Sequence, residues 1–176
     1  MPETLKEGRY LRLVVDQGWE WCERVNATGI VVIVALAPHA DGPRLLLVEQ
    51  YRRPLGARVL ELPAGLAGDH GDSDEAMSTA AQRELEEETG YRAAQMDALF
   101  EGPVSAGMTT EYLHWFFGRD LSRVGPGGGD ASEDIVVHEV PLDEVESFLA
   151  ARQAEGALVD PKVYAGLYAA RREGGS

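Results

Sequence analysis

The feature that most constrains this chain is a charged helical segment that ends at a glycine. It covers residues 75–91 and reads Glu-x7-Arg-Glu-Leu-x-Glu-Glu-x-Gly-Tyr. Residues from Ala80 to Thr89 are mostly good helix formers, and Gly90 is a natural residue for a helix C-terminus. The sequence therefore predicts a helix whose carboxylates crowd together near its C-terminal end.

On such a helix, Glu84, Glu87 and Glu88 occupy positions i, i+3 and i+4, so they share one face. Arg83 and Glu87 are also four residues apart and can hold each other in place. Like charges at this spacing cost roughly 0.2–0.5 kcal/mol per pair, and the helix macrodipole disfavours anions near the C-terminus. Such violations of local rules are expected at functional sites, and carboxylate oxygens suit Mg²⁺ or Mn²⁺. The alternative interpretation is a solvated acidic face that binds nothing.

The composition narrows the classes of partner. The chain has 176 residues and a formal net charge of −14. Nucleic acid and anionic membranes are therefore not expected as partners, because both require a basic surface. Cys22 is the only cysteine, which excludes an intrachain disulfide and a cysteine metal cluster. The sequence has no apolar run of membrane length and no recognisable signal peptide, so the expected location is the cytoplasm.

The apolar periodicity predicts strands on both sides of the charged helix. A hairpin is expected between residues 10 and 25, and the β-branched run from Ile30 to Leu36 is typical of a central strand buried on both faces. Further strands are expected over residues 45–50, 58–61, 98–104, 112–117 and 135–140. The glycine-rich stretch 125–130 is typical of a mobile loop.

Two further helices are expected, over residues 143–152 and from Asp160-Pro161 to about Arg171. For the charged helix, Thr79 with Gln82 three residues later resembles a capping box, and Ser73 is an earlier candidate cap.

The segment 75–91 resembles the Nudix box, the signature of the Nudix hydrolases. The family pattern is Gly-x5-Glu-x7-Arg-Glu-U-x-Glu-Glu-x-Gly-U, where U is apolar, and the chain fits it from Glu75 onward. Asp69 stands where the pattern has its opening glycine, and either Glu75 or Asp72 can fill the first acidic position. The resemblance implies an α/β fold, the Nudix α/β/α sandwich with a mixed β-sheet, for residues 1–176 as one domain with an N-terminal β-hairpin over residues 1–28.

Three more segments resemble the branch of this family that hydrolyses ADP-ribose and nucleoside-diphosphate sugars. The first, at 48–54, reads Val-Glu-Gln-Tyr-Arg-Arg-Pro and implies that Arg52, beside Arg53, contacts a phosphate or the terminal sugar. The second, at 105–111, resembles a Ser-Pro-Gly-x-x-x-Glu loop and implies a substrate role for Glu111. The third, Glu-Asp-Ile at 133–135, implies that Glu133 lies on a flexible loop that closes over the active site.

The resemblance also implies the chemistry of the site. Metal ligands are expected to be Glu84, Glu88 and the carbonyl oxygen of Ala64. Glu87 is expected to complete the metal set, with Arg83 orienting it. The general base is then Glu133 or Glu87, since a carboxylate must accept the proton of the attacking water.

The N-terminal hairpin is expected to contribute to a homodimer and to base binding. Trp19 and Trp21 are two residues apart, so they share a strand face and can present an indole to a base. An apolar face packed on the core or on a partner subunit explains the same spacing.

The expected activity is Mg²⁺- or Mn²⁺-dependent hydrolysis of an ADP-ribose-like pyrophosphate, which gives a nucleoside monophosphate and a sugar phosphate. The alternatives are a Nudix hydrolase for dinucleoside polyphosphates, nucleoside triphosphates or GDP-mannose, and a non-catalytic module that senses a nucleotide.

Overall fold

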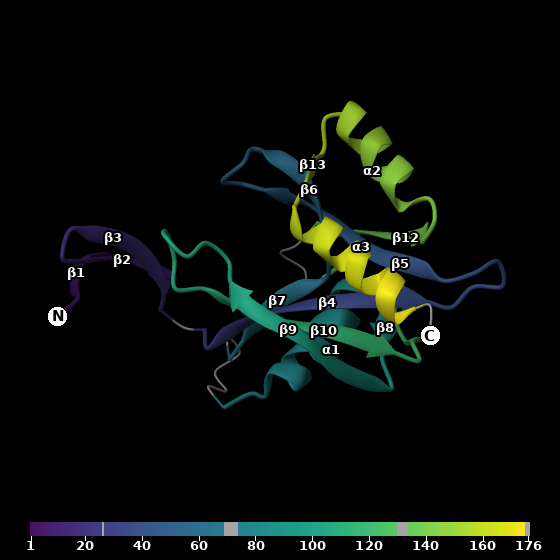
Figure 1. The fold of residues 1–176 in the computed structure, drawn as a ribbon, viewed down its shortest axis with the longest axis horizontal. Coiled ribbons are helices and arrows are strands. Elements are labelled where there is room, and N and C mark those ends of the chain that lie inside the picture. The colour runs from purple at the N-terminus through teal and green to yellow at the C-terminus, as the bar shows by residue number, and fades with distance from the viewer. Residues whose placement is uncertain (26, 69–73, 130–133, 175–176) are drawn as a thin grey trace.

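The computed structural model describes residues 1–25, 27–68, 74–129 and 134–174, and these ranges contain three helices and thirteen strands (Figure 1). The strands are β1 (Glu3–Glu7), β2 (Leu11–Asp16), β3 (Trp19–Arg24), β4 (Gly29–Ala37), β5 (Arg44–Arg52), β6 (Ala57–Glu61), β7 (Ala64–Ala67), β8 (Tyr91–Arg92), β9 (Gln95–Pro103), β10 (Tyr112–Arg119), β11 (Ser122–Arg123), β12 (Val136–Pro141) and β13 (Leu158–Val159). The helices are α1 (Met77–Thr89), α2 (Val145–Ala154) and α3 (Lys162–Glu173).

A mixed sheet forms the centre of the fold. Its strands run in the order β13-β6-β5-β4-β10-β9, with β12 paired to β5 and β7 paired to β4. β10 lies parallel to β4 and β13 lies parallel to β6, whereas β5 pairs antiparallel with β4, β6 and β12. The predicted α/β architecture with a mixed sheet is confirmed.

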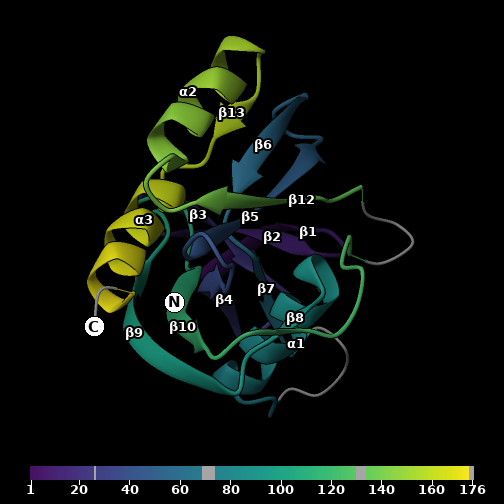
Figure 2. The same cartoon turned by 90° about the vertical axis from the view of Figure 1, so that its right-hand side faces the viewer.

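Helices cover both faces of this sheet (Figure 2). Alternate residues of a strand point to opposite faces, and β4 shows the consequence. Val32 packs in a core cluster with Leu167 of α3, while Ile33 packs in a second cluster with Leu85 of α1. Residues 31–35 are fully buried, which confirms the prediction of a central strand covered on both sides.

The start of α1 differs from the prediction. The helix begins at Met77, its N-cap is Ala76, and no side-chain hydrogen bond caps it. The predicted capping box at Thr79 is therefore wrong, because Thr79 lies inside the first turn and its amide donates to the Ala76 carbonyl. The other candidate cap, Ser73, lies outside the described residues.

The N-terminal segment is a separate antiparallel sheet of three strands, β1-β2-β3, rather than a two-stranded hairpin alone. It projects from the body of the molecule (Figure 1). Two contacts connect this sheet to the loop before β10. The amide of Cys22 donates to the Met108 carbonyl at 2.8 Å, and Arg24 pairs with Glu111 at 2.6 Å.

Five short strands are absent from the sequence prediction: β1, β7, β8, β11 and β13. The β7 sequence, Ala-Gly-Leu-Ala, has little strand propensity, so its conformation is set by pairing with β4.

None of the described helices combines the length and the apolar character that crossing a bilayer requires.

A charge cluster around the buried Glu49 of β5 joins this strand to β6, β12 and α2. The Glu49 side chain is 2% exposed, and its carboxylate accepts hydrogen bonds from Arg58 at 2.9 Å and Arg152 at 2.8 Å and lies 2.9 Å from His138. Burial raises the pKa of Glu49, but hydrogen bonds from Arg152, His138 and Arg58 outweigh it and hold the pKa below its ordinary value of 4.5. Arg58 also pairs with Asp134 at 2.7 Å, so the cluster fixes the residue that precedes β12 by two positions.

Candidate active site

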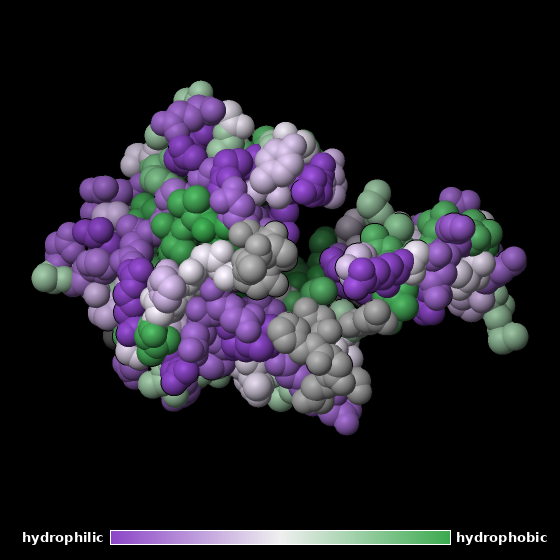
Figure 3. Space-filling model, turned by 180° about the vertical axis from the view of Figure 1, so that it is seen from behind, coloured by the Kyte–Doolittle hydropathy of each residue, from purple (hydrophilic) through white to green (hydrophobic). Residues whose placement is uncertain are grey.

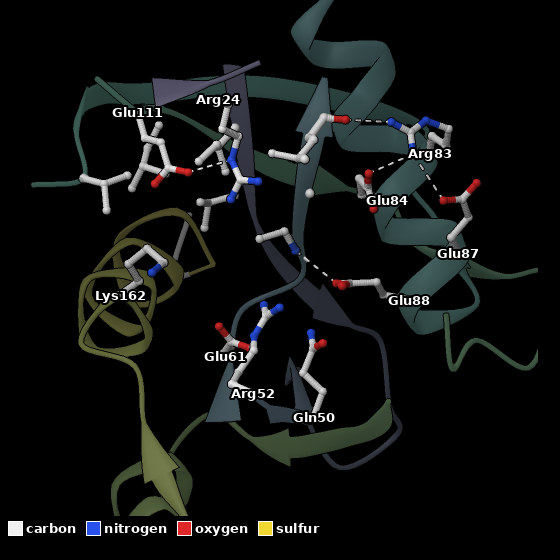
Figure 4. A pocket seen from close by; sticks show the side chains of 17 residues that line it. Arg24, Gln50, Arg52, Glu61, Arg83, Glu84, Glu87, Glu88, Glu111 and Lys162 are labelled. Carbon is white, nitrogen blue, oxygen red and sulfur yellow. Dashed lines mark hydrogen bonds and ion pairs between the residues drawn. The ribbon is translucent and has the colours of Figure 1, made fainter. Parts of the chain in front are cut away.

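A cavity of about 510 Å³ lies between α1 on one side and β3, β10 and the first turn of α3 on the other (Figure 4). Seven of the residues selected from the sequence line it: Arg52, Ala64, Arg83, Glu84, Glu87, Glu88 and Glu111. The structure therefore brings together side chains that are spread over sixty residues of sequence.

Glu84 lies against the backbone of β7. A Cβ atom added to Gly65 would stand 2.0 Å from the Glu84 carboxyl carbon, far inside van der Waals contact. The absence of a side chain at position 65 therefore creates the space that the Glu84 carboxylate occupies. The side chain of Glu84 is 12% exposed and accepts a hydrogen bond from Arg83 at 2.8 Å.

Glu88 faces Ala64, the residue before Gly65. Its carboxylate accepts a hydrogen bond from the Ala64 amide at 3.0 Å, and the residue is 5% exposed. Glu84 and Glu88 are one helical turn apart, so the two carboxylates lie at adjacent points along the Ala64–Gly65 segment. The Ala64 carbonyl, the third expected ligand, belongs to the same residue as the amide that Glu88 contacts.

Arg83 connects the acidic residues of α1 with the loop before the helix. Its guanidinium donates to Glu75 at 3.2 Å, to Glu87 at 3.2 Å and to the Leu66 carbonyl at 3.0 Å, in addition to Glu84. Burial lowers the pKa of Arg83, but the Glu75 and Glu84 carboxylates more than compensate and hold the pKa above its ordinary value. Arg83 is therefore cationic at every working pH and orients several carboxylates at once. The predicted pairing of Arg83 with Glu87 is confirmed.

Glu75 also accepts a hydrogen bond from the Gly68 amide at 3.0 Å. Glu75 thus connects the residue that follows β7 with Arg83 of α1. Asp72, the other candidate for the first acidic position of the pattern, lies outside the described residues.

The opposite wall of the cavity carries two cations that the sequence analysis did not select. Arg24, at the end of β3, pairs with Glu111 at 2.6 Å. Lys162, in the first turn of α3, pairs with Asp160 at 2.5 Å. Both residues face the α1 carboxylates across the cavity (Figure 4). The only sequence signal for Lys162 was its place directly after the predicted Asp160-Pro161 helix start.

The floor of the cavity comes from β5 and β6. Arg52 pairs with Glu61 at 2.8 Å, and Gln50 lies beside them (Figure 4). Arg53 follows Arg52 in the chain but is exposed and does not line this cavity. The two neighbouring arginines therefore lie in different surroundings.

The other selected residues lie elsewhere. Trp19 is 66% exposed at the tip of the N-terminal sheet, and Trp21 is half-buried, with its indole N–H donating to Glu23 at 2.8 Å. Neither tryptophan lines the cavity of this single chain. Glu133 lies outside the described residues.

The donor atoms suit a hard divalent cation. Carboxylate and carbonyl oxygens are the ligands that Mg²⁺ and Mn²⁺ prefer, and Glu84, Glu88 and the Ala64 carbonyl supply both kinds. In the described part of the chain no three acidic, histidine or cysteine side chains already converge on one point. The Glu84 carboxylate accepts a hydrogen bond from Arg83, and the Glu88 carboxylate accepts one from the Ala64 amide.

Comparison with known families decides the identity of this fold. The NUDIX domain matches residues 27–165, which include both walls of the cavity except for Arg24. The chain belongs to the Nudix family. It is accordingly a Nudix hydrolase, and enzymes of this family generally use divalent metal ions.

Two relatives show which Nudix proteins it resembles. The methanol dehydrogenase activator of Bacillus methanolicus is 32% identical over 154 residues, which is 84% of this chain and 80% of that protein. The ADP-ribose pyrophosphatase of Bacillus subtilis (strain 168) is 32% identical over 136 residues, which is 77% of this chain and 70% of that protein.

Among solved structures, a protein described as an ADP compounds hydrolase superposes with a TM-score of 0.69. The two sequences are 20% identical, and the superposition covers 98% of this chain and 90% of the other chain. At this identity the likeness shows the fold, and it extends to the N-terminal sheet as well as to the Nudix core.

Proposed function

We propose that this Nudix hydrolase cleaves the pyrophosphate of ADP-ribose or a closely similar nucleoside-diphosphate sugar, and releases a nucleoside monophosphate and a sugar phosphate. One observation carries the proposal: two α1 carboxylates lie against the Ala64–Gly65 backbone in a cavity whose other walls carry Arg24, Arg52 and Lys162. The relative from Bacillus subtilis, an ADP-ribose pyrophosphatase, supports this substrate class.

Glu84, Glu88 and the Ala64 carbonyl are proposed to hold Mg²⁺, with Mn²⁺ as a substitute and Glu87 as an additional ligand. When bound, the cation neutralises phosphate charge and lowers the pKa of a coordinated water. Arg83 holds Glu84 and Glu87 in place. A carboxylate must take the proton of the attacking water, and Glu133 or Glu87 is proposed for that task.

Arg52, Lys162 and Arg24 are proposed to bind the anionic and hydroxyl groups of the substrate. In the described chain each of these cations already has a carboxylate partner: Glu61, Asp160 and Glu111, respectively. These partners limit the net positive charge of the wall, which suits a substrate whose charge is partly neutralised by metal. Arg53, which is exposed, is proposed to act only if the substrate extends beyond the cavity.

We propose a homodimer that uses the N-terminal sheet of a single domain spanning residues 1–176. The sheet projects from the body (Figure 3). Its large exposed apolar side chains include Leu5, Tyr10, Leu11 and Trp19. In such a dimer Trp19 and Trp21 would reach the partner's cavity and stack on the base. Sedimentation should give twice the chain mass of 19.1 kDa, and Trp19→Ser should weaken association. We expect the enzyme in the cytoplasm, where nucleotide sugars are available.

The test compares ADP-ribose with GDP-mannose, diadenosine tetraphosphate and a nucleoside triphosphate, with and without chelator, and identifies products by chromatography. We expect Mg²⁺-dependent release of AMP and ribose phosphate to be fastest. Glu88→Gln should abolish turnover, while Glu86→Gln is the matched control, because Glu86 pairs with Arg92 and does not line the cavity.

Each contrary outcome has a distinct meaning. Preference for another substrate keeps the metal site and overturns the substrate assignment. Full activity in Glu88→Gln would overturn the metal site. Tight nucleotide binding without any turnover would favour a sensor instead of an enzyme.

A further inference from the structure

The helix that carries the proposed metal ligands ends in an unfavourable way. The last turns of α1 hold Glu84, Glu87 and Glu88, and no basic residue lies in its last turn. The last carbonyls of a helix lack partners within the helix, and the macrodipole places partial negative charge at the same end. Water or groups outside the helix must therefore satisfy these carbonyls.

The segment 124–129, which follows β11, does this with backbone amides. Gly128 donates to the Glu88 carbonyl at 2.8 Å and Gly129 donates to the Glu87 carbonyl at 3.0 Å. Val124 and Gly125 both donate to the Gly90 carbonyl, at 2.8 and 3.1 Å. Two of these four hydrogen bonds therefore end on the backbones of residues whose side chains face the cavity.

Only glycine allows so close an approach. A Cβ atom at Gly90 would stand 2.3 Å from the Gly125 carbonyl oxygen, and one at Gly127 would stand 2.4 Å from the Thr89 carbonyl carbon. The obstacles are backbone atoms, which cannot rotate away. Both glycines also have positive φ angles, 74° and 71°, a conformation that other residues adopt at a cost.

We propose that segment 124–129 is a backbone clamp that positions Glu87 and Glu88 for the cation, and that Gly127 is its critical positioning residue. The clamp would fix the last turn of α1 so that Glu88 stays aligned with the Ala64 amide and carbonyl. Partners that orient metal ligands from outside typically change metal affinity by about 10–100-fold when they are lost. The inference rests on the metal site of the proposed function.

The test compares Gly127→Ala with the control Gly125→Ala. At position 125 the added Cβ meets no atom within 4 Å, and φ is not positive. The control also keeps the backbone amide that donates to Gly90. Free Mn²⁺ is measured by electron paramagnetic resonance without substrate, and folding is checked by circular dichroism. We expect the Mn²⁺ dissociation constant to rise about tenfold or more in Gly127→Ala and to change less than twofold in Gly125→Ala. Unchanged affinity in folded Gly127→Ala would overturn the clamp. A wild-type protein that binds no Mn²⁺ would overturn the proposed function and the clamp with it.

A second measurement needs no variant, so it still tests the clamp if Gly127→Ala does not fold. In ¹⁵N-labelled wild-type protein, Mg²⁺ should shift the amide signals of Gly128 and Gly129 with the same midpoint as the Ala64 amide, which contacts Glu88 directly. The Gly42 amide, in a distant turn, should not move. Stationary Gly128 and Gly129 signals beside a shifting Ala64 signal would show that the metal site and the clamp are independent.

Discussion

Gly65→Ala should lower kcat/KM strongly and change the free energy of unfolding only slightly. The new Cβ would lie 2.0 Å from the Glu84 carboxyl carbon, whereas ordinary contacts begin at 3.4 Å. The carboxylate must therefore retreat by about 1.4 Å, the difference between these two distances. A displacement of about 1 Å in a catalytic constellation can cost about 100-fold in rate. We expect kcat/KM to fall by about two orders of magnitude, equivalent to about 2.7 kcal/mol of transition-state stabilisation.

The free energy of unfolding should change far less, because the clashing group is the end of a flexible side chain. Weakening the hydrogen bond from Arg83 to Glu84 costs about 1 kcal/mol, and replacing glycine by alanine recovers about 0.4–1 kcal/mol through the unfolded chain. The melting temperature should therefore stay within about 4 °C of the wild type.

The assay measures AMP release from ADP-ribose across a range of Mg²⁺ concentrations, with thermal melts on the same samples. Gly102→Ala is the matched control, since its Cβ meets no atom within 4 Å. Wild-type kcat/KM in Gly65→Ala would refute the assignment of Glu84 to the metal site. A large loss of stability in parallel with activity would refute the claim that the space beside Gly65 serves catalysis.

Three other predictions concern different parts of the molecule. Glu133→Gln should lower kcat much more than it weakens substrate binding; unchanged kcat would remove Glu133 from the mechanism. Lys162→Ala should raise KM for ADP-ribose about tenfold, or about 1.4 kcal/mol, and an unaltered KM would exclude a substrate contact. Glu49→Gln should cost about 1.5–3 kcal/mol of unfolding free energy, because it weakens the charged hydrogen bonds from Arg58 and Arg152, which retain Asp134 and Glu155 as partners. Because the pKa of Glu49 is lowered in the folded protein, its contribution to the free energy of unfolding is complete above about pH 4.5 and is lost as the pH falls through the folded pKa. Urea unfolding of the wild type and the variant should therefore give free energies that converge in acid.

The carboxylate face of α1 was predictable because its members lie within two helical turns. A period of 3.6 residues places Glu84, Glu87 and Glu88 on one side whatever the rest of the chain does. The central strand β4 was predictable for a similar local reason, since only a strand covered on both faces carries so continuous an apolar run. The capping box failed because helix ends depend on the incoming chain as well as on residue type.

Other features had no local signature. Strand β7 has weak strand propensity and forms because β4 offers it hydrogen bonds. Arg24 and Lys162 are separated by more than a hundred residues of sequence and come together only on the cavity wall that faces α1. No periodicity relates such positions, so their shared role could not be inferred from spacing.

The sequence by itself determined the chemical class of this protein: the Nudix box identifies a Nudix hydrolase and places three carboxylates and an arginine on one helix. Only the tertiary structure decided what these carboxylates face, namely the Ala64–Gly65 backbone and a wall of paired cations, and what binds the backbone at the end of their helix, namely segment 124–129. The physical reason is range. Helix periodicity acts over a few residues, whereas close approach between backbones, as at Gly65 and Gly127, depends on how distant segments pack together.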